Sequence, residues 1–343
     1  MRDIIYFTKK RNVLVLDQTL LPFQVKYVEA SNYKNIVNLI KKLGIRGAPA
    51  IGVAGSFAAF LALRDIPKKN ISDFHSLLIE RLSQIELSRP TAVNLKWSID
   101  RFREILNTNH SLSHRRMLQL FYKEAKEIYQ QEKKVSIKIS NFGSKLFSNK
   151  DKILTHCNTG SLATTGPGTA LGVIKSANKK YKGIKVFATE TRPLLQGSRL
   201  TVWECQQSKI DCTLITDSMA SHVIKNKEIN SVIVGADRIA INGDVANKIG
   251  TYQLAIACKY HKIPFYVAAP ISTFDFECKN GEMIKIEERL PEEIIKIKGS
   301  LVSGAKKVFN PAFDITPSKL ITAIITEKGI LYNPRKSVIE KFS

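Results

Sequence analysis

The sequence predicts an α/β protein in which a mostly helical amino-terminal domain is followed by a doubly wound parallel sheet. Two patterns predict this fold. Before about residue 145, apolar residues recur mainly at helical spacing. After about residue 151, short apolar runs alternate with helical stretches about every 25 to 30 residues, which is typical of right-handed βαβ crossovers. We therefore expect two domains, residues 1–145 and 146–343, divided near a cluster of Gly, Ser, Asn and Lys.

The amino-terminal domain is expected to begin with a hairpin and to continue with amphipathic helices. The hairpin strands would be residues 13–16 and 25–28, with a turn at Leu21-Pro22. Apolar residues at helical spacing predict helices over residues 35–43, 51–63, 74–87, 95–105 and 117–137.

A tight turn between the first two of these helices reads RGAPA and begins at Arg46. A Gly turn beside a Pro near a helix start leaves backbone N–H groups available to an anion, and Arg46 would add positive charge. An ordinary interhelical turn with a solvated Arg is the alternative, and the turn alone favours it.

The second domain alternates strands and helices. The expected strands are residues 152–156, 184–188, 211–215, 231–235 and 264–268. Helical stretches lie between them, near residues 166–179, 198–208, 218–225 and 247–262.

Polar residues follow the carboxyl ends of four of these strands. In a doubly wound sheet those ends face one crevice, so residues far apart in sequence converge there on one ligand. In strand order, the residues are Cys157, then Glu190, Arg192 and Gln196, then Asp217, and finally Asp237 with Arg238.

Some of these residues also have an alternative interpretation. A lone Cys such as Cys157 is commonly a small buried residue. Asp217 could simply cap the following helix. Asp237 is harder to dismiss, because an acid that ends an apolar strand loses hydration, which raises its pKa toward a value useful to a general acid. The glycines around Gly168 only partly match a dinucleotide fingerprint, so NAD binding is not favoured.

Composition excludes several classes of protein. The formal charge is +23, but the Lys residues are spread along the whole chain, which favours a solvated surface over a polyanion-binding one and would still attract an anionic substrate. Five cysteines without metal-ligand spacing suggest reduced thiols in a cytoplasmic protein and no structural zinc. No apolar run is long enough to span a membrane, and the amino terminus does not read as a secretory signal.

Long motifs resemble the methylthioribose-1-phosphate isomerase family of methionine salvage. They read LDQTLLP, RGAPAIGVAG, SRPTAVNL, THCNTGSLAT, TETRPLLQGSRLTVWE, GADRIAINGDVANKIGTYQLA, PFYVAAPISTFD and NPAFDITPSKLITAI, and they cover the chain from about residue 16 to 330. The regulatory subunits of translation initiation factor 2B and the ribose-1,5-bisphosphate isomerases share this fold. The resemblance implies a cytoplasmic homodimer with a Rossmann-like carboxyl-terminal domain and no cofactor or metal.

The resemblance also implies roles for particular residues. Cys157 matches the catalytic Cys and Asp237 the catalytic acid. Substrate-binding positions are matched by Arg46, Gly47, Ala48, Arg89, Gln196, Asn247 and Lys248. Two departures affect the shape of the pocket: Pro167 replaces a Tyr, and Ala188-Thr189 replaces Val-Asp.

The reaction of the family explains why these residue types are needed. The phosphate on the anomeric oxygen prevents ordinary ring opening, so Asp237 would protonate the ring oxygen. Cys157 as thiolate would then remove the C2 proton, or a hydride would move from C2 to C1. The thiolate would be favoured by the following helix N-terminus, and His156 would be a packing residue. Phosphate would be held by Arg46, Arg89 and Lys248, and domain closure would exclude water.

Two other functions remain open from the sequence. One is isomerisation of a related sugar phosphate, such as 5-deoxyribose 1-phosphate or ribose 1,5-bisphosphate. The other is a non-catalytic regulatory role like that of the initiation factor 2B subunits. A nucleic-acid or membrane partner is not expected.

Overall fold

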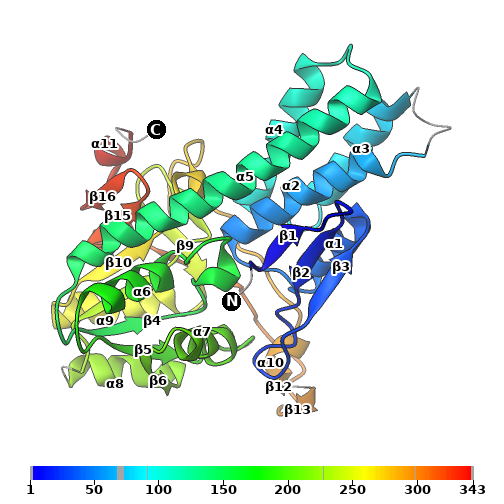
Figure 1. The fold of residues 1–343 in the computed structure, drawn as a ribbon. Coiled ribbons are helices and arrows are strands. Elements are labelled where there is room, and N and C mark those ends of the chain that lie inside the picture. The colour runs from blue at the N-terminus through cyan, green and yellow to red at the C-terminus, as the bar shows by residue number, and fades with distance from the viewer. Residues whose placement is uncertain (1–2, 68–72, 91, 227, 298, 341–343) are drawn as a thin grey trace. The chain divides into compact units, whose positions relative to one another are not determined.

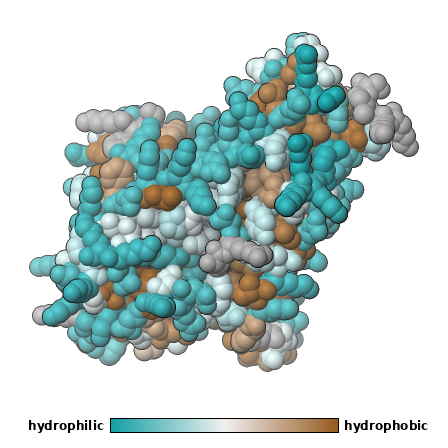
Figure 2. Space-filling model, in the orientation of Figure 1, coloured by the Kyte–Doolittle hydropathy of each residue, from teal (hydrophilic) through white to brown (hydrophobic). Residues whose placement is uncertain are grey.

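The computed structural model describes residues 3–67, 73–90, 92–226, 228–297 and 299–340. Its contacts divide the chain into two compact units, each of which is described by itself. The first unit comprises Met1–Ser136 and Ser161–Gly166, and the second comprises Ile137–Gly160 and Pro167–Ser343. The face shown in Figure 2 is mostly hydrophilic, with hydrophobic side chains scattered across it.

The first unit combines a small antiparallel sheet with a bundle of helices (Figure 1). The sheet order is β1-β2-β3, with β1 at Ile5–Phe7, β2 at Val13–Leu16 and β3 at Tyr27–Ala30. The predicted hairpin is therefore present, but its second strand begins two residues later than expected and β1 was not anticipated. The helices are α1 (Tyr33–Lys41), α2 (Ala48–Arg64), α3 (Phe74–Glu86), α4 (Val93–Thr108) and α5 (His114–Gly143).

Helix α2 forms the centre of the first unit, because every one of its residues except Arg64 is buried. Small residues make this possible. A Cβ at Gly52 would lie 2.9 Å from the carbonyl oxygen of Asn94, and one at Gly55 would lie 2.4 Å from a methyl of Leu95. The glycines thus let α2 pack closely against α4, as the small-residue pattern of the sequence allows.

The second unit is built on a large sheet that confirms the predicted fold class. Within the described residues this sheet has seven strands in the order β16-β15-β10-β7-β4-β5-β6. Every neighbouring pair is parallel except β15 with β16. Numbered along the chain, the parallel strands run 3-2-1-4-5-6, the order of a doubly wound dinucleotide-type sheet. The strands are β4 (Lys152–Thr155), β5 (Lys185–Thr189), β6 (Asp211–Ile215), β7 (Ser231–Val234), β10 (Phe265–Ala268), β15 (Ala323–Thr326) and β16 (Gly329–Tyr332).

Helices cover both faces of this sheet. Residues of α8 (Ala220–Lys225) and α9 (Thr251–His261) share a buried apolar cluster with Leu154, Val232 and Ile324. On the other face, the end of α5 meets Val173 of α6 (Ala170–Lys180) and Ile325 around Gly143. Because successive strand residues point to opposite faces, Ile324 packs on the side of α8 and α9, whereas Ile325 packs on the side of α5 and α6.

Smaller elements complete the second unit. A second sheet has the order β11-β8-β9-β14, and a short ribbon pairs β12 with β13. Their bounds, with those of the remaining helices, are α7 (Val202–Gln207), β8 (Arg238–Ala240), β9 (Val245–Lys248), β11 (Phe274–Asp275), α10 (Glu292–Ile295), β12 (Lys296–Ile297), β13 (Ser300–Leu301), β14 (Phe313–Thr316) and α11 (Lys336–Ile339).

One predicted element is wrong at its start. Residues 247–262 were expected to be helical, but Asn247 and Lys248 end strand β9, and α9 begins only at Thr251. Strand β9 pairs with β14, whose residue Asp314 lies opposite Asn247. Strand β9 also pairs with β8, but that register covers only Val245 and Ala246, so Asn247 and Lys248 depend on the distant β14. Gly250, with a φ of 104°, makes the turn from strand to helix.

Candidate active site

The carboxyl ends of three adjacent strands carry three of the predicted site residues. Strand β4 lies between β7 and β5. Cys157 follows β4, Asp237 follows β7, and Gln196 lies in the segment after β5. The strand order reverses between β4 and β7, and in open α/β sheets ligands bind outside the carboxyl ends at such a switch point. Cys157 and Asp237 are therefore at the position where the topology places a ligand.

Cys157 sits in a backbone conformation that side-chain-bearing residues seldom adopt. Its φ is 61°, and its side chain is buried. Such a conformation costs on the order of 1–3 kcal/mol and persists only where neighbouring contacts enforce it. Two threonines supply contacts of this kind: the Cys157 N–H donates to Thr191 Oγ1 at 2.9 Å, and its carbonyl accepts from Thr201 Oγ1 at 2.6 Å.

His156 is a buried structural residue, in agreement with the packing role predicted for it. Its Nε2 lies 2.9 Å from the carbonyl oxygen of Ile249, which can only accept, so Nε2 carries the proton. Its Nδ1 then accepts from Thr189 Oγ1 at 2.6 Å. Burial lowers the pKa of His156, so the ring is neutral near pH 7. This ring therefore braces the segment before Cys157 against the turn before α9.

Asp217 holds the turn after β5 instead of capping its own helix. Its two carboxylate oxygens accept from the N–H groups of Thr191 and Arg192, at 2.8 and 2.7 Å. Thr191 also has a positive φ, of 63°. Asp217 thus supports the residue that holds Cys157, and neither of the alternatives predicted from the sequence describes this contact.

Asp237 begins the connection from the large sheet to the small one. It is half-buried, and its N–H donates to the carbonyl of Ala246 at 2.9 Å. The contact places the Asp237 backbone beside β9, next to Asn247. The neighbouring Arg238 pairs with Asp275 at 3.5 Å, so its charge has a carboxylate partner of its own.

Asn247 and Lys248 are both buried at the end of β9. The Asn247 amide donates to Thr251 Oγ1 at 2.9 Å. The Lys248 ammonium donates to the carbonyl of Ala312 at 2.8 Å and lies 4.7 Å from the centre of the Phe313 ring.

Asp314 lies beside these residues and was not predicted. It accepts from the N–H groups of Gly250 and Tyr252, at 2.7 and 3.1 Å, and so caps the start of α9. Burial raises the pKa of Asp314 to about 6. The Asp within NPAFD gave no sign of this role, because its partners lie more than sixty residues earlier.

Gln196 offers a buried acceptor. The residue is 5% exposed, and its Oε1 has no hydrogen-bond partner within the part of the chain that the structure describes. A buried acceptor without a partner costs free energy, so this atom suits a ligand hydroxyl or N–H group.

The first unit carries the predicted RGAPA turn, and a glycine is required there. Gly47 is the N-cap of α2, with a φ of 91°. A Cβ at this position would lie 2.5 Å from Cα of Ala163, a residue of the same unit. The first turn of α2 contains no acidic residue, and half-buried Arg46 precedes it. This arrangement has the features of an anion-binding helix start.

The first unit also carries Arg89, which is half-buried in the turn after α3. Its carbonyl accepts from the N–H of Ala92 at 3.1 Å. Thr91 of the same motif lies outside the described residues.

No metal site is formed by the described residues. No group of three or more His, Cys, Asp and Glu side chains among them is placed to hold an ion. The five cysteines are free thiols. In the described part of the chain, the helices are too short or too polar to cross a bilayer.

The sequence of the chain is similar to a known family and to known proteins. Residues 44–333 match the model of the Initiation factor 2 subunit family. The chain is 49% identical over 329 residues to a methylthioribose-1-phosphate isomerase from Acetivibrio thermocellus, with 96% of each chain covered. It is 46% identical over 343 residues to a protein of the same name from Thermoanaerobacter sp. strain X514, with 99% of each chain covered.

Solved structures agree with these matches. A 5-methylthioribose 1-phosphate isomerase from Pyrococcus horikoshii OT3 superposes with a TM-score of 0.91 at 36% identity, covering 99% of this chain and 95% of the other. A structure described as subunit delta of translation initiation factor eIF-2B from A. fulgidus gives a TM-score of 0.86 at 40% identity, covering 99% and 98%. The resemblance expected from the motifs is confirmed.

Proposed function

The chain belongs to the Initiation factor 2 subunit family, and we propose that within it the protein is an aldose–ketose isomerase that converts 5-methylthioribose 1-phosphate to 5-methylthioribulose 1-phosphate. This is the reaction of methionine salvage to which the names of its relatives point. The observation that carries the proposal is the placement of Cys157 and Asp237 after adjacent strands, on the two sides of the switch point.

Asp237 is proposed as the acid of the first step. The anomeric oxygen of the substrate is a phosphate ester, so the ring cannot open through a free hemiacetal. Protonation of the ring oxygen breaks its bond to C1 and leaves C1 as an oxocarbenium ion stabilised by the ester oxygen. Asp237 is half-buried just after the carboxyl end of β7, on one side of the switch point where ligands of open α/β sheets bind.

Cys157 is proposed to act at C1 and C2. In one route its thiolate removes the C2 proton to give an enediol phosphate, and a proton is then delivered to C1. In the other route a hydride moves from C2 to C1 while a base takes the O2 proton. Both routes end in the ketose, and both need water excluded from a reactive intermediate.

Substrate binding is proposed for the remaining predicted residues. In the second unit, Gln196 supplies an unpartnered buried acceptor for a hydroxyl group, and Asn247 and Lys248 supply buried donors. In the first unit, Arg46, Gly47 and Ala48 form the anion-binding start of α2, and Arg89 supplies a further cation. Charged hydrogen bonds to a phosphate contribute about 1.5–3 kcal/mol each.

The proposal extends to assembly and location. A homodimer in the cytoplasm is supported by the family resemblance of the sequence and by the free thiols. Light scattering of the purified protein should give a mass near twice the 38.5 kDa of one chain. A mass of 38.5 kDa would contradict the dimer.

The deciding experiment is turnover of methylthioribose 1-phosphate in deuterium oxide, with Cys157→Ser and Asp237→Asn as comparisons. We expect ketose product from the wild-type protein and a loss of about 100-fold or more in each variant. Solvent deuterium at C1 would support the proton route, and its absence a hydride shift. Turnover that survives in either variant would contradict the assigned roles.

A second candidate is a binding role without catalysis. The A. fulgidus structure that is 40% identical carries the name of an initiation factor subunit, which favours this alternative. The same assay separates the two, because a regulatory subunit would give no product. Absence of turnover with methylthioribose 1-phosphate would first direct the assay to 5-deoxyribose 1-phosphate and ribose 1,5-bisphosphate.

A further inference from the structure

Glu204 is a buried carboxylate for which the proposed reaction has no direct use. It lies on α7, is only 1% exposed, and both of its oxygens are engaged. Oε1 accepts from the Asn158 amide at 2.9 Å, and Oε2 accepts from the Lys175 ammonium at 2.6 Å. A carboxylate is seldom kept fully buried without such partners.

The Asn158 contact makes Glu204 relevant to catalysis, because Asn158 directly follows Cys157. Thr201, three residues before Glu204, donates to the Cys157 carbonyl at 2.6 Å and also lies 3.3 Å from the Asn158 amide. Residues three apart share one face of a helical segment. One face of the segment that enters α7 therefore contacts both Cys157 and Asn158, which are successive residues of the turn after β4.

The same turn also contacts Glu204 at Gly160, three residues after Cys157. A Cβ at Gly160 would lie 2.3 Å from either carboxylate oxygen of Glu204. Gly160 in turn forms an antiparallel bridge to Gly168. The segment from Cys157 to Gly160 thus lies directly against the Glu204 carboxylate, with space at Gly160 only for a hydrogen atom.

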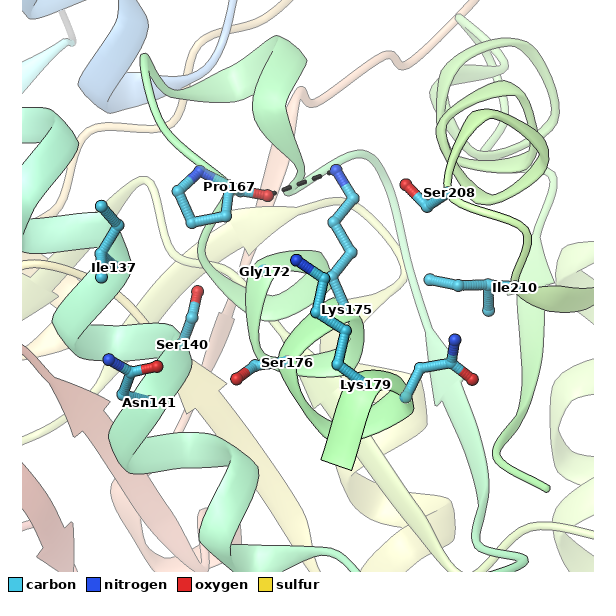
Figure 3. A pocket seen from close by; sticks show the side chains of 11 residues that line it. Ile137, Ser140, Asn141, Pro167, Gly172, Lys175, Ser176, Lys179, Ser208 and Ile210 are labelled. Carbon is cyan, nitrogen blue, oxygen red and sulfur yellow. Dashed lines mark hydrogen bonds between the residues drawn. The ribbon is translucent and has the colours of Figure 1, made fainter. Parts of the chain in front are cut away.

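Lys175, which supplies the positive charge opposite Glu204, lines a neighbouring cavity. A cavity of about 560 Å³ lies between the end of α5, helix α6 and the segment before β6, and Lys175 lines it. Figure 3 shows the Lys175 side chain rising from α6 past the cavity toward the Pro167 carbonyl, which its ammonium meets at 3.3 Å. The side chain is 14% exposed. The ammonium thus reaches the buried carboxylate from the solvent side.

From these contacts we infer that Glu204 is a positioning residue for Cys157, acting through Asn158 and Gly160, and that Lys175 is the counter-charge of the buried Glu204 carboxylate. The inference rests on the proposed catalytic role of Cys157. Neither residue needs to touch the substrate.

The test uses purified full-length variants and two measurements. The variants are Glu204→Ala, Asn158→Ala, Lys175→Met and the double variant Lys175→Met with Glu204→Gln. The first measurement is kcat and KM for methylthioribose 1-phosphate. The second is the pH dependence of Cys157 alkylation by iodoacetamide, followed by mass spectrometry of the peptide. The second measurement reports on the turn whether or not this substrate is turned over.

We expect Glu204→Ala and Asn158→Ala to lower kcat by about 100-fold with little change in KM, since a small displacement of a reacting group has effects of that size. Lys175→Met alone should fold poorly, because it removes the ammonium that meets a buried carboxylate. The double variant should recover much of the activity, because the glutamine that replaces Glu204 keeps an oxygen for Asn158 and carries no charge.

A matched ion pair on the same unit is the control. Lys152 and Glu228 also lie 2.6 Å apart, but both are substantially exposed, and Lys152 is on β4 at the end remote from Cys157. Lys152→Met and Glu228→Gln should leave kcat and the alkylation profile unchanged.

The outcomes separate this inference from the proposed function. If Glu204→Ala and Asn158→Ala fold and keep both kcat and the alkylation profile of the wild type, Glu204 is only structural and the inference is wrong. If the wild-type protein turns over no substrate but the alkylation profile still shifts in the Glu204 variants, the proposed function fails and the positioning role stands.

Discussion

The N–H of Cys157 donates to Thr191 Oγ1 over 2.9 Å, and this bond joins the turn after β4 to the turn after β5. Both residues have a positive φ, so each turn has an unfavourable backbone conformation on its own. The shared hydroxyl makes the two conformations depend on each other, and Asp217 fixes the second of them through the Thr191 N–H.

Replacing Thr191 by Val should therefore disturb Cys157 while nearly preserving side-chain shape. The buried N–H would lose its acceptor, which costs about 1–3 kcal/mol of stability. We expect a lower melting temperature and a drop in kcat of about tenfold or more. Thr191→Ser keeps the hydroxyl and is the control. Equal activity of the Val and Ser variants would show that this bond does not hold the turn.

The buried His156 should make stability depend on acid. Burial keeps its pKa below the usual 6.5, so below about pH 6.5 the unfolded chain binds a proton that the folded ring does not. Stability from this group is complete above that pH and falls as pH decreases, by up to about 1.4 kcal/mol per pH unit. Urea unfolding at pH 7 and pH 5 should show a smaller loss for His156→Gln than for the wild type. The exposed His222, replaced by Gln, is the control, and equal losses in all three proteins would refute the prediction.

Asp314 should have the opposite pH dependence. Its pKa of about 6 in the folded state exceeds the ordinary value of 3.8. Between about pH 4 and pH 6 the folded protein therefore keeps a proton that the unfolded chain has released, and stability from this group decreases as pH rises through that window. Above pH 6 the effect is constant. The stability difference between wild type and Asp314→Asn, measured by urea unfolding from pH 4 to pH 7, should fall and then level off. A difference independent of pH would contradict the raised pKa.

Gly47→Ala should destabilise the first unit for two reasons that can be separated. Its φ of 91° disfavours any side chain, and the new Cβ would also collide with Ala163. Gly329→Ala is the matched control, because Gly329 has a φ of 138° but nothing lies within 4 Å of the added Cβ. We expect about 1 kcal/mol for Gly329→Ala and clearly more for Gly47→Ala. Equal melting temperatures for the two variants would show that the collision is relieved without cost.

Much of the second unit was predictable because its central strands β4, β7 and β10 are buried on both faces. The run 231–235 reads SVIVG and has an apolar centre, and Asp237 follows it after one alanine, so both the strand and the position of Asp237 can be read locally. Cys157 was predictable for the same reason. The βαβ alternation does not by itself tell which strands are neighbours in the sheet. The strand order, and with it the switch point between β4 and β7, comes from the structure.

Several of the missed features depend on distant partners, although the buried apolar strand β15, at Ala323–Thr326, was not predicted either. The end of β9, at Asn247 and Lys248, pairs with β14 and lies beyond the register of the neighbouring strand β8, and the role of Asp314 depends on the start of α9. The burial of Glu204 depends on Lys175 from another helix. Ser161–Gly166 belongs to the first unit through contacts such as the Gln18 amide to the Leu162 carbonyl at 2.7 Å, which no periodicity reveals.

The central position of β4 also has a consequence for synthesis on the ribosome. Ile153 pairs with Val186 on one side and with Ser231 on the other. The nascent chain can thus pair one edge of β4 with β5 soon after β4 has been synthesised. The strand that pairs with the second edge, β7, is synthesised much later. At about 5–20 residues per second, β4 remains for several seconds with the N–H and C=O groups of that edge unpaired. Early folding intermediates of this protein should therefore be prone to edge-to-edge aggregation until Ser231–Val234 has emerged.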